Sequence, residues 1–143
     1  MNEYRIESKE EVESYLAKLR YALDQGAKIA FQEIRRIDDN RAEKYTNRYT
    51  IAHLFPNENP KDVLRKELKS LTVKNYLRTV KDTRFRKRSE MREFGKIYHS
   101  SDEVYIKVRV ELLDKTGFGK HTAFVMSFHF AERSFAEEYF PYQ

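Results

Sequence analysis

Two segments of alternating polarity, EVYIKVRVELL at residues 103–113 and HTAFVMSFHFA at residues 121–131, predict the centre of the fold. Successive side chains of a β-strand point to opposite faces of the sheet, so this alternation indicates two strands, each with one buried and one open face. Val104 and every second residue after it form the apolar set of the first strand. Its open face carries Tyr105, Lys107, Arg109 and Glu111.

The second segment divides into two alternating sets. We expect Thr122, Phe124, Met126, Phe128 and Phe130 to share one face, and His121, Ala123, Val125, Ser127 and His129 to share the other. If the strands form a hairpin, Leu113 lies opposite His121 and, counting back, Tyr105 lies opposite His129. Directly opposed Cβ atoms are about 5 Å apart, so both side chains can meet one small group. A slip of two residues would leave the pair on one face as diagonal neighbours.

The composition indicates a small globular protein. Of the 143 residues, 40% are hydrophobic and 36% are charged, which fits one domain spanning residues 1–143. No apolar run approaches the roughly 20 residues that span a bilayer. The start, MNEYRIESKEEVE, is acidic, unlike a signal peptide. The chain has no cysteine, which excludes disulfides and thiol catalysis. We therefore expect a cytoplasmic protein with no membrane partner.

A basic segment precedes the two strands. Residues 74–98 hold nine basic and three acidic side chains, a net charge of +6, whereas the whole chain carries +5. A local positive excess interleaved with aromatic side chains favours a polyanionic partner such as RNA. A solvated charged loop is the alternative interpretation. The candidate RNA-binding residues here and on the next strand are Lys81, Arg84, Arg86, Lys87, Arg88, Lys96, Lys107 and Arg109.

The rest of the chain predicts helices and strands around this hairpin. Ser8 and Glu11 form a capping-box pattern, and Asn59 followed by Pro60 is typical of a helix start. A helix restarting at Leu71 would expose Arg78. We expect helices at 9–25, at 60–70 and from 71, strands at 28–35 and 91–99, and a loop at 37–50. This is an α+β domain with an antiparallel sheet of about four strands and helices packed on one face.

Tyr105 and His129, with cations around them, suit chemistry on a phosphodiester. The candidate catalytic residues are Tyr105, His129, Arg78 and Arg92. One side chain can take the proton from an RNA 2′-hydroxyl, another can protonate the departing 5′-oxygen, and guanidinium groups can stabilise the phosphorane. The sequence contains no metal-binding or cofactor motif, so we expect neither. Each of these residues also has a structural interpretation, in which Tyr105 covers the sheet and His129 is held by hydrogen bonds.

Three short motifs carry a family resemblance. They are NYLR at residues 75–78, VYIK at residues 104–107 and MSFH at residues 126–129. Their order resembles the MqsR family of toxins, which have the RelE-type ribonuclease fold. The resemblance implies a metal-independent mRNA interferase that a cognate antitoxin protein neutralises, and that cuts mRNA either free or on the ribosome.

The resemblance also implies roles for four residues. The family's catalytic tyrosine matches Tyr105, and its helical lysine falls on Arg78, whose guanidinium keeps its proton under ordinary conditions. Its glutamine aligns with Arg92. Its C-terminal lysine falls on His129, a residue type suited to acid–base chemistry near neutral pH.

Two other functions fit the same sequence. A non-catalytic RNA- or DNA-binding module would stack bases on the aromatic side chains of the sheet and bind without cleavage. A protein-interaction domain from a mobile element would use the basic face to bind an acidic partner.

Overall fold

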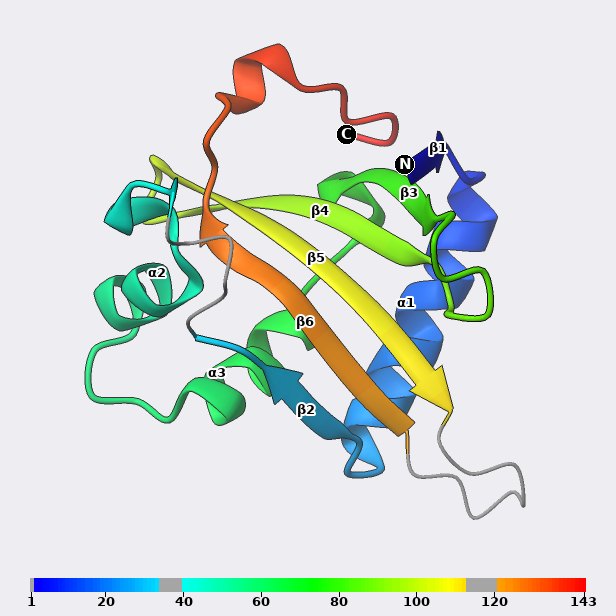
Figure 1. The fold of residues 1–143 in the computed structure, drawn as a ribbon, viewed down its shortest axis with the longest axis horizontal. Helices are drawn as coiled ribbons and strands as arrows, with labels where there is room; N and C mark the ends of the chain where they lie inside the picture. Colours follow the sequence, from blue (N-terminus) through cyan, green and yellow to red (C-terminus); the bar gives the residue numbers. More distant parts are fainter. Residues whose placement is uncertain (1, 34–39, 113–120) are drawn as a thin grey trace.

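The computed structural model describes residues 2–33, 40–112 and 121–143, which form an α+β structure with a six-stranded sheet (Figure 1). The strands, in spatial order, are β1 (Asn2–Arg5), β3 (Tyr76–Asp82), β4 (Met91–Tyr98), β5 (Asp102–Leu112), β6 (His121–Phe130) and β2 (Lys28–Phe31). Neighbouring strands are antiparallel, except that β2 runs parallel to β6. The α+β class is confirmed, but the sheet is mixed and larger than the expected four antiparallel strands.

Three helices pack on one face of the sheet, with α1 passing behind β5 and β6 in Figure 1. They are α1 (Lys9–Asp24), α2 (Asn47–Leu54) and α3 (Pro60–Lys69). The expected capping box of Ser8 and Glu11 begins α1, and Asn59 accepts two backbone hydrogen bonds at the start of α3. Their apolar faces meet strand residues such as Ile106 and Phe128 in the core. No helix among the described residues is long and apolar enough to span a membrane.

Two local expectations were wrong. Residues from 71 onward do not restart a helix: after a single 3₁₀ turn, Val73–Asn75, the chain enters β3. Pairing with β1 on one side and β4 on the other overrides the helical spacing of the apolar residues there. The loop expected at 37–50 is partly helical, because Thr46 caps a helix, α2, that begins at Asn47. Residues 34–39 of that loop lie outside the described residues.

The register of β5 and β6 shifts once. Tyr105 pairs with His129 and Lys107 with Ser127, but Val108 pairs with Val125, so Met126 is an extra residue in β6. The expected Tyr105–His129 pairing is therefore confirmed, whereas His121 pairs with Leu112 rather than Leu113. The bulge also means that the residues expected to share one face (Thr122, Phe124, Met126, Phe128 and Phe130) do not all do so. Val125 and Phe128 both lie in the core, so these residues do not alternate uniformly along the strand.

Side chains of α2 hydrogen-bond to the edge of β6 at the residues that do not pair with β2. Asn47 donates to the carbonyl of Met126 at 3.3 Å and accepts from the amide of Phe128 at 3.0 Å. Thr50 accepts from the amide of Phe130 at 2.9 Å. Both side chains are fully buried, so these bonds satisfy strand groups that would otherwise be buried without partners. The helix thereby holds the bulge in place.

The segment after β6, residues 131–143, returns across the top of the sheet toward the N-terminus (Figure 1). A Cβ atom at Gly95 of β4 would lie 2.7 Å from the ring of Phe135 and 2.9 Å from that of Phe140. Farther along, Tyr142 stacks on Tyr76 and its hydroxyl donates to the carbonyl of Glu7. The missing side chain of Gly95 therefore lets two aromatic rings anchor this segment on the sheet.

Replacing Gly95 with alanine tests this close approach. We expect Gly95→Ala to lower the free energy of unfolding by about 1–3 kcal/mol, because the added methyl group overlaps the Phe135 ring. Phe135→Ala makes room for the methyl group, so the double variant should lose less than the sum of the two single losses. Urea denaturation of the four proteins measures this coupling, and simple additivity would contradict the contact.

Candidate functional site

Tyr105 and His129 face each other on the sheet face opposite the helices. They are directly paired across β5 and β6, and their ring centroids lie 5.4 Å apart at an interplanar angle of 38°. The neighbours of Tyr105 along β5, Val104 and Ile106, point into the core. The side of the sheet that carries Tyr105 and His129 was therefore predictable from alternation. The bulge in β6 keeps His129 on the same face as Tyr105.

The backbone fixes the tautomer of His129. Its Nδ1 lies 2.9 Å from the carbonyl oxygen of Phe130. A carbonyl oxygen only accepts hydrogen bonds, so in the neutral ring Nδ1 carries the proton and Nε2 has the lone pair. The side chain is only 5% exposed. His129 is thus a held imidazole whose Nε2 can accept a proton.

A buried carboxylate, Glu93 of β4, organises the charges beside this pair. It is 3% exposed and is paired across the sheet with Arg78 of β3 and with Lys107 of β5. The Arg78 guanidinium donates to it at 2.7 Å, and Lys107 Nζ lies 4.0 Å away. The negative charge of Glu93 also acts on the Tyr105 hydroxyl and raises its pKa. One carboxylate therefore connects both cations with the aromatic pair.

The surroundings keep Tyr105 protonated and Arg78 charged. Burial raises the pKa of Tyr105 strongly, and the negative charge of Glu93 raises it further. Burial alone would lower the pKa of Arg78, but Glu93 and Glu138 outweigh it and the net shift is upward. Tyr105 can therefore act as a hydrogen-bond or proton donor and not as a resting phenolate.

A pocket of about 310 Å³ lies at the Tyr105–His129 pair. Its floor includes Tyr105, Lys107 and His129, and its rim comes from the segment after β6 and from Arg41. Arg41 forms an ion pair with Glu132 at 2.9 Å. The other lining residues are Leu77, Ser127, Ala131, Glu132, Arg133, Phe135 and Glu138. The pocket is large enough for a small group such as one phosphodiester linkage to meet Tyr105 and His129 together.

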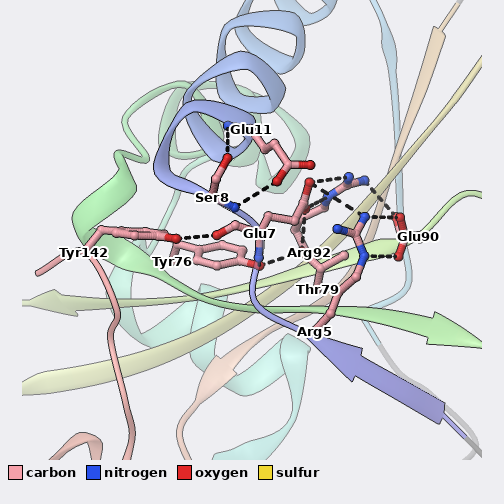
Figure 2. A network of polar contacts seen from close by, with 9 residues as sticks. All are labelled: Arg5, Glu7, Ser8, Glu11, Tyr76, Thr79, Glu90, Arg92 and Tyr142. Carbon is pink, nitrogen blue, oxygen red and sulfur yellow. Dashed lines mark hydrogen bonds and ion pairs between the residues drawn. The ribbon is translucent and has the colours of Figure 1, made fainter.

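Arg92 lies on the other side of the sheet, which corrects its expected place beside Tyr105. It pairs with Val108, a core residue, so it faces α1. Figure 2 shows its guanidinium directed at Glu7, to which Arg92 Nε donates at 2.8 Å. It also lies over the ring of Tyr15, 4.3 Å from the centroid. Arg92 is therefore part of a buried ion pair on the helix side.

Glu7 is the centre of this second network (Figure 2). It accepts a hydrogen bond from Thr79 as well as from Arg92, and Arg5 approaches to 3.8 Å. Burial alone would raise the pKa of Glu7, but the hydrogen bonds from Arg92 and Thr79 outweigh it and the net shift is downward. The network ties the N-terminus to β3 and β4.

Lys96 is also on the helix side and does not reach the Tyr105 pocket. Its Nζ donates to Ser70 at 2.6 Å and lies 3.5 Å from Glu67. Arg109 stays on the pocket side, but it stacks on Phe124 at 4.3 Å and pairs with Glu111. Of the cations expected around the pair, Arg78 and Lys107 are the two that contact Glu93.

The remaining expected RNA-binding residues form the β3–β4 hairpin. Lys81 donates to the carbonyls of Arg86 and Arg88 at 2.8 and 2.7 Å, so it holds the turn. Arg84 through Arg88 are exposed, and Arg88 lies over the ring of Phe85 at 3.9 Å. Ser89 anchors the hairpin to Glu111, six residues from Tyr105 along β5, which corresponds to about 20 Å. The hairpin is therefore a separate basic surface.

Glu93, Glu138 and the pocket wall formed by residues 131–143 were not predicted from the sequence. Alternation offered a signal for Glu93: if Arg92 and Phe94 share one face, Glu93 must be on the other. Gly95 inside a strand was a weaker signal of close backbone approach. No local pattern predicts that Glu138 reaches Arg78, because that contact joins residues 60 positions apart.

No group of three or more His, Cys, Asp or Glu residues in the described ranges is arranged to hold a metal ion. No family model, curated protein or solved structure matches this chain. The function must therefore be argued from the site itself.

Removing Arg92 tests its place in the buried ion pair. We expect Arg92→Ala to lower the free energy of unfolding by about 3 kcal/mol, because Glu7 stays buried without its main partner. The pKa of Glu7 is lowered by folding, so the pair contributes fully above the ordinary carboxyl pKa and its contribution is lost as pH falls through the folded pKa.

Urea denaturation at neutral pH and at successively lower pH measures this loss. The difference between wild type and Arg92→Ala should shrink in acid. Arg84→Ala is the control, because Arg84 forms an exposed pair with Asp82 and such pairs contribute little. Equal stability of Arg92→Ala and wild type would place Arg92 outside any buried ion pair.

Proposed function

We propose that this protein is an endoribonuclease that cleaves RNA by attack of a 2′-hydroxyl on the adjacent phosphate, without a metal ion. The observation that carries the proposal is the opposed pair of Tyr105 and His129 in a pocket that also contains Lys107. An imidazole, a protonated phenol and an ammonium group supply a proton acceptor, a proton donor and positive charge. These are the elements that the reaction requires.

In the proposed reaction His129 Nε2 takes the proton from the 2′-hydroxyl. The 2′-oxygen then bonds to phosphorus, and the bond from phosphorus to the 5′-oxygen breaks. Tyr105 donates its proton to the departing 5′-oxygen, and the proton held by His129 restores Tyr105. The products are a 2′,3′-cyclic phosphate and a 5′-hydroxyl, so the net transfer is one proton from the 2′-oxygen to the 5′-oxygen.

Lys107 and Arg78 supply the positive charge at the site. Lys107 Nζ lies 4.0 Å from Glu93, and its side chain lines the pocket, where it can meet a phosphate oxygen. Arg78 is held more tightly, by Glu93 at 2.7 Å and Glu138 at 2.5 Å. We assign Lys107 the stabilisation of the phosphorane and Arg78 the positioning of the RNA backbone.

The resemblance to MqsR toxins supports a biological setting for this activity. The protein would act in the cytoplasm on mRNA, free or bound to the ribosome, and a cognate antitoxin protein would neutralise it. One element of the resemblance is weakened: Arg78 lies on strand β3 and not on a helix, so its match to the family's helical lysine rests on spacing alone.

Replacing His129 tests the proton acceptor. Wild-type protein incubated with mixed-sequence RNA in EDTA should produce 2′,3′-cyclic phosphate ends, and His129→Ala should slow cleavage by about a hundredfold or more. His121→Ala is the matched control, because His121 lies on the same strand at the far end from the pocket. The same comparison on translating ribosomes tests a ribosome-dependent toxin.

Wild-type activity in His129→Ala would remove that residue from the mechanism. RNA binding without cleavage, free or on ribosomes, would instead favour the non-catalytic RNA-binding module. A specific feature supports that second candidate: the exposed β3–β4 hairpin carries Phe85 between Arg84 and Arg88, an arrangement suited to base stacking and phosphate contact.

Replacing Tyr105 with phenylalanine tests the proton donor. Tyr105→Phe keeps the ring against His129 but removes the proton, so we expect a loss of cleavage of about a hundredfold with little change in RNA affinity. Single-turnover rates and anisotropy titrations separate the two quantities. Equal losses of rate and affinity would assign Tyr105 to binding alone.

A further inference from the structure

A second pocket adjoins the candidate active site. It is an open depression of about 420 Å³, lined by Tyr4, Arg5, Ile6, Arg78 and Arg133. Arg133 lines both pockets. The second pocket lies at the edge of the sheet, where β1 pairs with β3. Neither the sequence motifs nor the proposed proton transfers use it.

The Glu138 carboxylate lies between Arg78, which lines the second pocket, and Arg133, which lines both pockets. One oxygen of Glu138 lies 2.5 Å from Arg78 Nη2, and the other lies 3.9 Å from Arg133 Nε. Two guanidinium groups on either side of one anion form the arrangement that also binds a phosphate. Glu138 thus occupies the place where a chain running between the pockets would put a phosphate.

An aromatic ring is presented at the far side of the second pocket. Tyr4 is 63% exposed, and Ile6, which follows β1, is 48% exposed. Tyr4 pairs with Val80, which sets it on the same face of the sheet as Arg78. An exposed tyrosine beside a cation pair suits a nucleobase and its phosphate.

We infer that the second pocket binds the nucleotide next to the cleaved linkage, with its base on the Tyr4 ring and its phosphate between Arg78 and Arg133 in place of the Glu138 carboxylate. The inference rests on the proposed ribonuclease function and names a subsite for the RNA substrate. It also gives Glu138 a role: this carboxylate competes with RNA, so RNA must displace it from the arginines.

Glu138 can leave without unfolding the segment that carries it. The rings of Phe135 and Phe140 hold this segment over Gly95, and Tyr142 anchors its end at Tyr76. Glu93 is the less suited carboxylate to move, because its side chain is more deeply buried than that of Glu138, at 4% against 14% exposed. Exchange at Arg78 therefore involves Glu138.

The test is binding of a fluorescent RNA oligonucleotide that is 2′-O-methylated throughout, measured by anisotropy in EDTA. The methyl groups remove the attacking hydroxyl, so binding is measured independently of cleavage. We expect Tyr4→Ala to weaken binding roughly tenfold, in the range for loss of one stacked base. Tyr4→Phe, which keeps the ring, should bind like wild type.

Two further variants complete the design. Tyr21→Ala is the matched control. Tyr21 is 66% exposed, an exposed fraction similar to that of Tyr4, but it lies on α1. This variant should bind like wild type. Glu138→Gln removes the competing charge and should bind RNA several-fold more tightly. Circular dichroism and thermal denaturation confirm that each variant is folded.

Unchanged affinity in Tyr4→Ala, an equal loss in Tyr4→Phe, or weaker binding by a folded Glu138→Gln would each overturn the subsite. Absence of binding to wild type would do the same. Binding that depends on Tyr4, together with no cleavage of unmodified RNA either free or on translating ribosomes, would instead overturn the ribonuclease and keep the subsite. Cleavage that depends on His129, with binding unaffected by Tyr4→Ala, would keep the ribonuclease and overturn the subsite.

Discussion

The register shift at Met126 is the constraint on which the candidate site depends. Without the extra residue, a strand that turns Val125 toward the core would also turn His129 toward the core, because the two are four positions apart and would share a face. The bulge lets the core take Val125 and Phe128 while His129 faces Tyr105. Asn47 of α2 stabilises it, because its side chain hydrogen-bonds to the carbonyl of Met126 itself and to the amide of Phe128. A helix on one face of the sheet therefore determines which side chain lines the pocket on the other.

Charge balance is the second constraint, and it separates the two faces. Glu93 on the pocket side and Glu7 on the helix side are both buried carboxylates with arginine partners. A buried carboxylate that loses its partner destabilises a protein by several kcal/mol, on the order of 3–5. Arg92 is therefore committed to Glu7. Arg78 also has Glu138, on a segment anchored by other contacts, so part of its hydrogen-bonding capacity can be exchanged for a ligand.

The candidate site was partly predictable because its central pair depends on local rules. Alternation in the two strands indicated that Tyr105 points away from the core, and hairpin counting paired it with His129. The same counting misaligned His121, because a bulge cannot be recognised from alternation alone. Arg92 and Lys96 were assigned to the pocket from charge and proximity in sequence, although alternation places them on the face of Phe94, which is buried in the core.

By itself, the sequence determined the elements whose signals lie within a few residues: the capped helices α1 and α3, and the strands β4, β5 and β6. Only the tertiary structure decided that the residues after Leu71 form a strand, that β2 joins β6 in parallel, and that Glu138 reaches Arg78. The physical reason is the distance along the sequence over which each interaction acts. Helix caps and alternation arise from neighbouring residues, whereas strand pairing and buried ion pairs depend on which distant segments the core brings together.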